Sequence, residues 1–174
     1  MLKFRVLSAD EIDCRVATVS EKGCSLLLYK DARCDMNILD ETVGPENWSR
    51  RHYEVKGNLH CEVSIWDEQK KQWVSKADCG TESYTEKEKG ECSDSFKRAC
   101  FNWGIGRELY TAPFIWIPAE KMNISNKNGK PTTYDKFAVE KILINEAKRI
   151  TALSILNTTK KCRAYVWQEQ TKGG

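Results

Sequence analysis

Lys97 and Arg98 stand side by side within ECSDSFKRACFNWGIGRELY, residues 91–110, inside a pattern of apolar residues. Phe101 follows Lys97 by four residues, and Arg107 follows the turn at residues 104–106. Residues four apart lie on one strip of a helix, so Lys97 and Phe101 would share a surface. Cations beside an exposed aromatic ring suit a single-stranded nucleic acid, because the charges follow phosphates and the ring stacks on a base. The pattern favours binding over catalysis, and we expect no catalytic residue.

A local ion pair is the competing interpretation of these cations. Asp94 and Arg98 are four residues apart, and such a pair stabilises a helix by a few tenths of a kcal/mol. The two glycines of the turn do not form a dinucleotide fingerprint, because they follow a helical pattern and lack the third glycine. The chain also contains no GxxxxGK[ST] motif. We therefore expect neither ATP nor any other cofactor.

A metal-dependent nuclease is the alternative from another functional class. Such enzymes need carboxylates that converge on a divalent metal, with a lysine or water-activating group nearby. Several carboxylates fall near predicted strand ends, namely Asp67, Glu68, Asp78, Glu82 and Glu86. These residues lie in predicted turns and a charged connector, where solvated carboxylates are usual, so we expect neither an enzyme nor a metal site.

Charge is distributed unevenly along the chain. Residues 121–174 carry 11 Lys and Arg against 4 Asp and Glu, while the first 120 residues carry 17 against 21. Any basic surface is therefore local and built partly from the C-terminal third. A solvated basic tail is the alternative explanation.

The eight cysteines contain no CxxC pair, and only two histidines accompany them, so the spacing of a zinc site is missing. We expect reduced, partly buried thiols in a cytoplasmic protein. The polar, acidic start LSADEIDC predicts no signal peptide, and no apolar run approaches the roughly 20 residues that span a membrane.

Periodicity predicts the elements that position Lys97 and Arg98. Ala32, Met36, Leu39 and Val43 recur at helical spacing, so we expect a helix over 31–43 that Asp31 caps and Gly44-Pro45 ends. The segments RRHYEVK, LHCEVSIW and QWVSKADCG predict a three-stranded antiparallel meander, with turns at Gly57-Asn58 and DEQKK. A second helix follows over 88–103, with its apolar stripe formed by Cys92, Phe96, Ala99, Cys100 and Trp103, and with Gly104 as its C-terminal cap.

The remaining chain predicts further strands. Residues 111–120 are apolar but interrupted by Pro113 and Pro118, so we expect an irregular segment, and residues 122–134 predict a flexible loop. KFAVEKILI, RITALSIL and CRAYVW predict strands joined by turns at NEAK and NTTKK. The order of elements predicts an α+β fold in one domain over residues 1–174, with a core at about 7–120 and C-terminal strands at about 135–168.

Several motifs in order resemble the phage Sak-type single-strand annealing proteins, relatives of the eukaryotic Rad recombination mediators. SDSFKRACFNWGIGRELY is similar to the signature helix and turn of that family. YKDARCDMNILDETVGPENWSRR at 29–51 and ADCGTES at 77–83 resemble further landmarks, and LSADEIDCRV at 7–16 resembles the opening, although Cys14 stands where a tryptophan is expected. The resemblance covers about residues 7–110, and the C-terminal strands loosely.

The resemblance implies a β-β-β-α core in rings or arcs of subunits, with single-stranded DNA in a basic groove that crosses them. Lys97 and Arg98 match the lysine-arginine pair of that groove, and Arg33 stands next to a DNA-contacting arginine position, which is Cys34 here. Phe101 replaces another groove arginine, and Pro45 replaces a groove aromatic. We expect Phe101 either to stack on bases or to pack against a neighbouring subunit.

Further phosphate contacts are predicted at Arg50 and Arg51 beside the meander, and at Lys70 and Lys71 on a hairpin tip, against the alternative of solvated surface. For Lys87 and Lys89, which alternate with glutamates, solvated surface is the favoured interpretation. The predicted function is ATP-independent annealing of complementary single strands in recombination and repair, and an RNA-binding module with the same groove remains a second alternative. The resemblance suggests a homo-oligomer, a single-strand binding protein or exonuclease as partner, and a bacterial host cytoplasm. Residues available for subunit contacts are Trp66, Trp73, Phe114, Ile115 and Trp116, against the alternative that they belong to the ordinary core.

Overall fold

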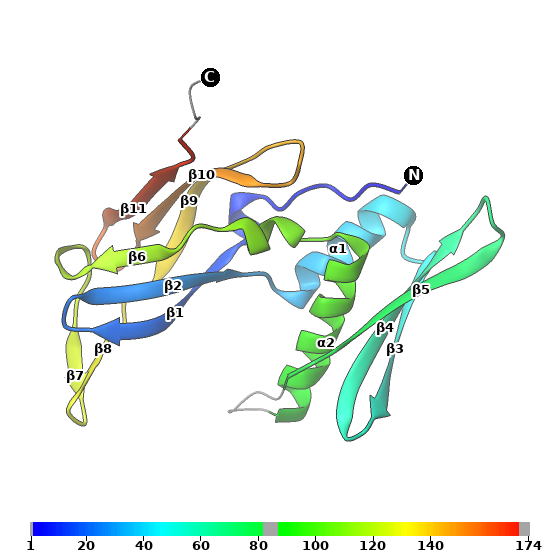
Figure 1. Cartoon of the computed structure of the whole chain (residues 1–174), viewed down its shortest axis with the longest axis horizontal. Coiled ribbons are helices and arrows are strands. Elements are labelled where there is room, and N and C mark those ends of the chain that lie inside the picture. The colour runs from blue at the N-terminus through cyan, green and yellow to red at the C-terminus, as the bar shows by residue number, and fades with distance from the viewer. Residues whose placement is uncertain (1, 82–86, 171–174) are drawn as a thin grey trace. The chain divides into compact units, whose positions relative to one another are not determined.

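The computed structural model describes residues 2–81 and 87–170, apart from the side chains of residues 87–89. The fold is α+β, as predicted, with two α-helices and mostly antiparallel strands in these residues (Figure 1). Contacts divide the chain into two compact units. The first contains Met1–Arg5 and Asp31–Gly106, and the second contains Val6–Lys30 and Arg107–Gly174. The extent of the predicted single domain stays a prediction.

Helix α1 of the first unit, Ala32–Val43, begins and ends where the sequence predicts. The Asp31 side chain accepts a hydrogen bond from the backbone N–H of Arg33, and Gly44 ends the helix with φ of 86°. The buried face differs from the predicted stripe, because among the predicted residues only Leu39 is buried. The residues that α1 buries are Cys34, Asp35, Ile38 and Leu39.

The predicted meander is present in the first unit. Strands β3 (Trp48–Val55), β4 (Asn58–Asp67) and β5 (Gln72–Cys79) form an antiparallel sheet in the order β3-β4-β5. The first turn lies one residue earlier than predicted, because Val55 pairs with Asn58 across Lys56-Gly57. Both turn residues have positive φ, 53° and 77°, which is the backbone of a type I′ hairpin.

Helix α2, Lys87–Trp103, packs against β4 and β5. Phe96, Ala99 and Cys100 are fully buried, and the indole N–H of Trp103 donates to the Val63 carbonyl over 2.9 Å, which confirms most of the predicted apolar stripe. Gly104 follows with φ of 96°, and its N–H donates to the Phe101 carbonyl. The glycine C-terminal cap is therefore confirmed.

The second unit is a six-stranded antiparallel sheet in the order β11-β10-β9-β1-β2-β6. Its two edge strands approach each other, since the Tyr165 hydroxyl of β11 donates to the Phe114 carbonyl just before β6 over 3.2 Å. Side chains of β2, β6, β10 and β11 share one core. The strands are β1 (Asp13–Ser20), β2 (Gly23–Tyr29), β6 (Ile115–Pro118), β9 (Phe137–Ile144), β10 (Ile150–Asn157) and β11 (Cys162–Gln168).

Strands β9, β10 and β11 lie where the C-terminal strands are predicted, whereas two other predictions for this unit are wrong. The segment predicted to be irregular contains β6, which pairs with β2 along Ile115–Pro118. The predicted flexible loop contains a hairpin of β7 (Ser125–Lys127) and β8 (Lys130–Thr132), joined by Asn128-Gly129. Both turn residues again have positive φ, so the hairpin repeats the backbone conformation of the β3–β4 turn. Three short 3₁₀ segments complete the unit: η1 (Ala9–Glu11), η2 (Arg107–Thr111) and η3 (Ala119–Lys121).

All eight cysteines lie within the described residues and are thiols rather than disulfides. No helix in the described residues is both long enough and apolar enough to cross a membrane.

Candidate nucleic-acid interface

Lys97, Arg98 and Phe101 lie on the side of α2 that faces away from the sheet. The neighbouring residues Phe96, Ala99 and Cys100 are completely buried, while these three side chains are half-buried. The helical period therefore places the cationic pair and the aromatic ring outside the apolar stripe, as predicted. We call Arg33, Lys97, Arg98 and Phe101 the helix-pair surface, because they come from α1 and α2.

Arg98 is held by the carboxylate one turn earlier on α2. Its Nε lies 2.9 Å from Oδ2 of Asp94, and the backbone N–H and hydroxyl of Thr81 donate to the same oxygen over 2.9 and 3.0 Å. Burial raises the pKa of Asp94, but the hydrogen bonds from the Thr81 N–H and the Arg98 guanidinium lower it by more. The pKa of Asp94 therefore lies below its ordinary value. The Asp94–Arg98 ion pair, which the sequence offers as the alternative to nucleic-acid binding, is therefore present.

Arg33 and Lys97 both act on Asp31, at the start of α1. Arg33 donates from Nε and Nη2 to the two carboxylate oxygens of Asp31, each over 3.2 Å, and its side chain is 82 % exposed. The pKa of Asp31 is lowered chiefly by the Arg33 hydrogen bonds and additionally by the charge of Lys97. Cations 64 positions apart in the chain therefore lie within electrostatic reach of one carboxylate.

Lys76 is a further cation against α2, and the sequence interpretation does not include it. Its Nζ donates to the Asn102 carbonyl over 2.9 Å and lies 5.0 Å from the centre of the Trp103 ring. The Asn102 amide in turn donates to the Ala77 carbonyl of β5. A lysine is favoured here because carbonyls at a helix C-terminus carry partial negative charge. The sequence signal that could have identified Lys76 is the alternation along β5. It places Lys76 on the same face of the strand as Val74.

Arg50 and Arg51 point to opposite faces of β3, so they do not form one phosphate site. The Arg50 guanidinium lies 4.7 Å from the centre of the Phe96 ring, on the face that α2 covers. Arg51 pairs with Glu62 over 2.9 Å and lies over Tyr53 on the other face. Successive side chains of a β-strand point to opposite faces of the sheet, so the neighbours Arg50 and Arg51 must lie on different faces.

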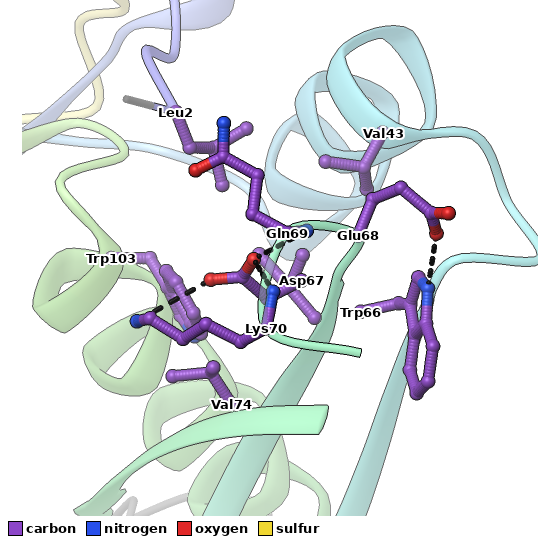
Figure 2. A pocket seen from close by; sticks show the side chains of 10 residues that line it. Leu2, Val43, Trp66, Asp67, Glu68, Gln69, Lys70, Val74 and Trp103 are labelled. Carbon is purple, nitrogen blue, oxygen red and sulfur yellow. Dashed lines mark hydrogen bonds and ion pairs between the residues drawn. The ribbon is translucent and has the colours of Figure 1, made fainter. Parts of the chain in front are cut away.

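Lys70 and Lys71 lie in the β4–β5 turn, as predicted, and each is paired with an acid. Lys70 lies 3.4 Å from Asp67, and Lys71 pairs with Glu68. The turn is therefore locally neutral. Its base borders a cavity of about 320 Å³ (Figure 2). Apolar walls come from Leu2, Val43, Ile65, Val74 and Trp103, and the polar rim comes from the turn.

The described carboxylates of the nuclease alternative serve local structure. Asp67 accepts the backbone N–H groups of Gln69 and Lys70, and Glu68 accepts the Trp66 indole N–H. Asp78 accepts the Cys79 N–H and the Asn102 amide. Glu82 and Glu86 lie outside the described residues. Within the described part of the chain, no group of three or more His, Cys, Asp or Glu side chains converges as metal ligands do.

Arg107 is exposed at the start of η2 and belongs to the second unit, whereas the helix-pair surface belongs to the first. The side chains of Lys87 and Lys89 lie outside the described residues.

Comparison with protein-family models, curated proteins and solved structures finds no match to this chain.

Proposed function

We propose that this protein binds single-stranded DNA along its phosphate backbone and anneals complementary strands without ATP, in recombination and repair. The observation that carries the proposal is that α1 contacts α2, so that the exposed Arg33 of α1 lies on the same helix pair as the half-buried Lys97 and Arg98 of α2. Cations from two helices then follow a phosphate backbone, and Phe101 supplies a ring for stacking. The resemblance of residues 93–110 to the signature helix and turn of single-strand annealing proteins supports the same function.

The helix-pair surface has a small net charge, and this determines how it would work. Its three cations face two carboxylates, Asp31 and Asp94. One subunit therefore binds only a few phosphates, and a strand needs several subunits in a ring or arc to be held firmly. Arginines oriented by carboxylates keep their planar donors in place, and a phosphate competes for the same donors.

Annealing by this route needs no nucleotide. Duplex formation itself releases about 1.4 kcal/mol per base-pair step. The protein removes strand self-structure, lowers the repulsion between phosphates and leaves bases exposed for pairing. A β-β-β-α assembly core made of β3, β4, β5 and α2 is part of the proposal, as is a single-strand binding protein or exonuclease as partner.

The decisive experiment compares Lys97→Gln with Lys3→Gln. Both substitutions remove one positive charge from the first unit, and Lys3 is an exposed residue in the N-terminal segment. Fluorescence anisotropy with a labelled oligothymidylate and an annealing assay in EDTA without ATP are the measurements. We expect Lys97→Gln to weaken binding about tenfold and to slow annealing, with Lys3→Gln close to wild type. Equal effects of the two substitutions, or none, would contradict the proposal.

The same assays separate the alternatives. RNA and DNA oligonucleotides of one sequence, in competition, test the RNA-binding module, because a preference for RNA would reassign the substrate. Labelled DNA incubated with magnesium tests the nuclease, because any shortening of the strand would show cleavage. Native mass measurement with and without oligonucleotide tests the proposed oligomer.

A further inference from the structure

Seven lysines gather at one end of the second unit, although they come from segments far apart in the chain. We call this group the lysine end, and its members are Lys22, Lys121, Lys127, Lys130, Lys136, Lys160 and Lys161. They come from the β1–β2 turn, η3, the β7–β8 hairpin, the segment before β9 and the β10–β11 turn. These segments occupy the left side of Figure 1. All seven side chains are exposed.

Hydrogen bonds tie four of these five segments together, and β8 of the β7–β8 hairpin contacts β1. The Ala119 N–H donates to the Lys22 carbonyl over 3.0 Å, which joins η3 to the β1–β2 turn. The Lys160 ammonium donates to the Glu120 carbonyl over 2.8 Å, which joins the β10–β11 turn to η3. The Thr158 N–H donates to the Lys136 carbonyl over 2.8 Å. The lysine end is therefore a built surface rather than a solvated tail.

Asp135 fixes the geometry of this end, and its carboxylate also interacts electrostatically with Lys160. Its side chain is buried, and it accepts the backbone N–H of Asn123 over 2.7 Å and the Asn157 amide over 2.6 Å. The side-chain oxygen Oδ1 of Asn157 accepts the N–H groups of Thr159 and Lys160, which shapes the β10–β11 turn. The Asp135 carboxylate is thus used inside the fold.

Positive charge at this end is largely uncompensated. Within the described residues, none of the seven lysines forms an ion pair with a carboxylate. The acidic residues of the same segments are Glu21, Glu120 and Asp135. Clustered charge of one sign raises the local concentration of a polyanion and accelerates its association.

We propose that the lysine end binds the phosphate backbone of a nucleic acid, as a contact separate from the helix-pair surface. Lysine ammonium groups act as point charges on phosphates and require no particular base. Tyr134, 66 % exposed beside Lys136, adds a ring for stacking. An anionic membrane fits less well, because a surface helix or loop that enters lipid presents several large apolar side chains. The inference goes beyond the proposed function and does not depend on Lys97 or Arg98.

The test compares two triple variants of the full chain that remove equal charge. Lys127→Gln, Lys130→Gln and Lys161→Gln alter the lysine end. Lys3→Gln, Lys56→Gln and Lys141→Gln alter exposed lysines elsewhere. Affinity for oligothymidylate is measured from 50 to 300 mM salt. We expect the first triple to reduce the slope of log K against log salt by about 2, at about 0.7 per lost phosphate contact, and the second to leave it nearly unchanged.

Other outcomes overturn the inference. Equal slopes for the two triples would show a net-charge effect without a site, and an unchanged slope in the first would remove the contact. Sedimentation with vesicles containing anionic lipid is the parallel arm, since vesicle binding lost in the first triple with DNA binding retained would assign the surface to a membrane. The Lys97→Gln variant distinguishes the two proposals, because the lysine-end contact should survive in it.

Discussion

The guanidinium of Arg98 lies 2.9 Å from the carboxylate of Asp94, one helical turn earlier on the exposed side of α2. The same carboxylate oxygen accepts two hydrogen bonds from Thr81, so the pair joins the helix to the residue that follows β5 and Gly80. Asp94 therefore both orients Arg98 and cancels its charge.

Asp94→Asn should strengthen binding of single-stranded DNA while weakening the fold. The amide keeps the shape of the carboxylate and an oxygen for Thr81, but it no longer neutralises Arg98. We expect affinity to rise several-fold at low salt, and the free energy of unfolding to fall by about 1 kcal/mol because a charged hydrogen bond is lost. Anisotropy and urea titration are the measurements.

Asp10→Asn is the matched control for that change, because Asp10 is an exposed carboxylate in η1 of the second unit. An equal gain in affinity in both variants would assign the effect to net charge alone. A loss of affinity in Asp94→Asn would show that orientation of Arg98 matters more than its charge.

Acid should destabilise the protein below about pH 4, and Asp135 should contribute to that loss. Burial raises the pKa of Asp135, but hydrogen bonds from Asn123 and Asn157 lower it more, and the pKa is below its ordinary value. A carboxyl with a depressed pKa stabilises the fold above its unfolded pKa, near 4, and this stabilisation disappears as the pH falls through the folded value.

Asp135→Asn should cost about 1–3 kcal/mol at pH 6, because buried donors lose their acceptor. It should also make the free energy of unfolding fall less steeply between pH 4 and pH 2. Urea unfolding followed by tryptophan fluorescence at several pH values measures both. If the variant and the wild type lose stability in parallel below pH 4, Asp135 is not one of the groups responsible.

Gly80→Ala should be strongly destabilising, since the backbone of α2 passes directly over Gly80. An added Cβ would lie 2.5 Å from the Glu91 carbonyl oxygen and 3.0 Å from the Ser95 nitrogen. Helix and strand must separate to admit it, and we expect a loss of about 3 kcal/mol. Gly57→Ala is the comparison, because its Cβ meets no atom within 4 Å and only its φ of 77° opposes the change, at about 1 kcal/mol. Similar melting temperatures for the two variants would be inconsistent with close packing at Gly80.

Three thiols should react slowly with an alkylating reagent in the folded protein. Burial, with a smaller contribution from the charge of Asp13, raises the pKa of Cys14 to about 12. Burial likewise raises the pKa of Cys24 and of Cys61 to about 11. The thiolate is the reactive form, so at pH 8 these cysteines should be protected, and unfolding in urea should expose them. Mass spectrometry of peptides after timed iodoacetamide treatment gives the rates, and rapid labelling of Cys14 in the folded state would contradict the prediction.

Local pattern was sufficient for most elements of the fold. The helices at 31–43 and 88–103, the meander and the C-terminal strands all follow from apolar periodicity bounded by caps and turns, because these signals depend on neighbours in the chain. The β7–β8 hairpin was also readable, since Asn128-Gly129 is the dipeptide that a type I′ turn prefers, but the polar composition of the segment favoured a loop. Strand β6 was missed because Pro113 and Pro118 suggested irregular structure, whereas Pro113 precedes the strand and Pro118 is tolerated at the end of an edge strand.

Residue types and spacing alone placed Lys97, Arg98 and Phe101 on the exposed side of one helix, and helical period is the reason. Only the tertiary structure decided that Arg33 and Lys97 act on the same carboxylate. Arg33 approaches Lys97 because α1 contacts α2, whereas the Arg98–Asp94 pair follows from helical spacing and was visible in the sequence. The basic C-terminal third became a defined surface because antiparallel pairing brings the β1–β2 and β10–β11 turns to the same end of one sheet. Such pairing joins residues more than a hundred positions apart, and no local pattern records it.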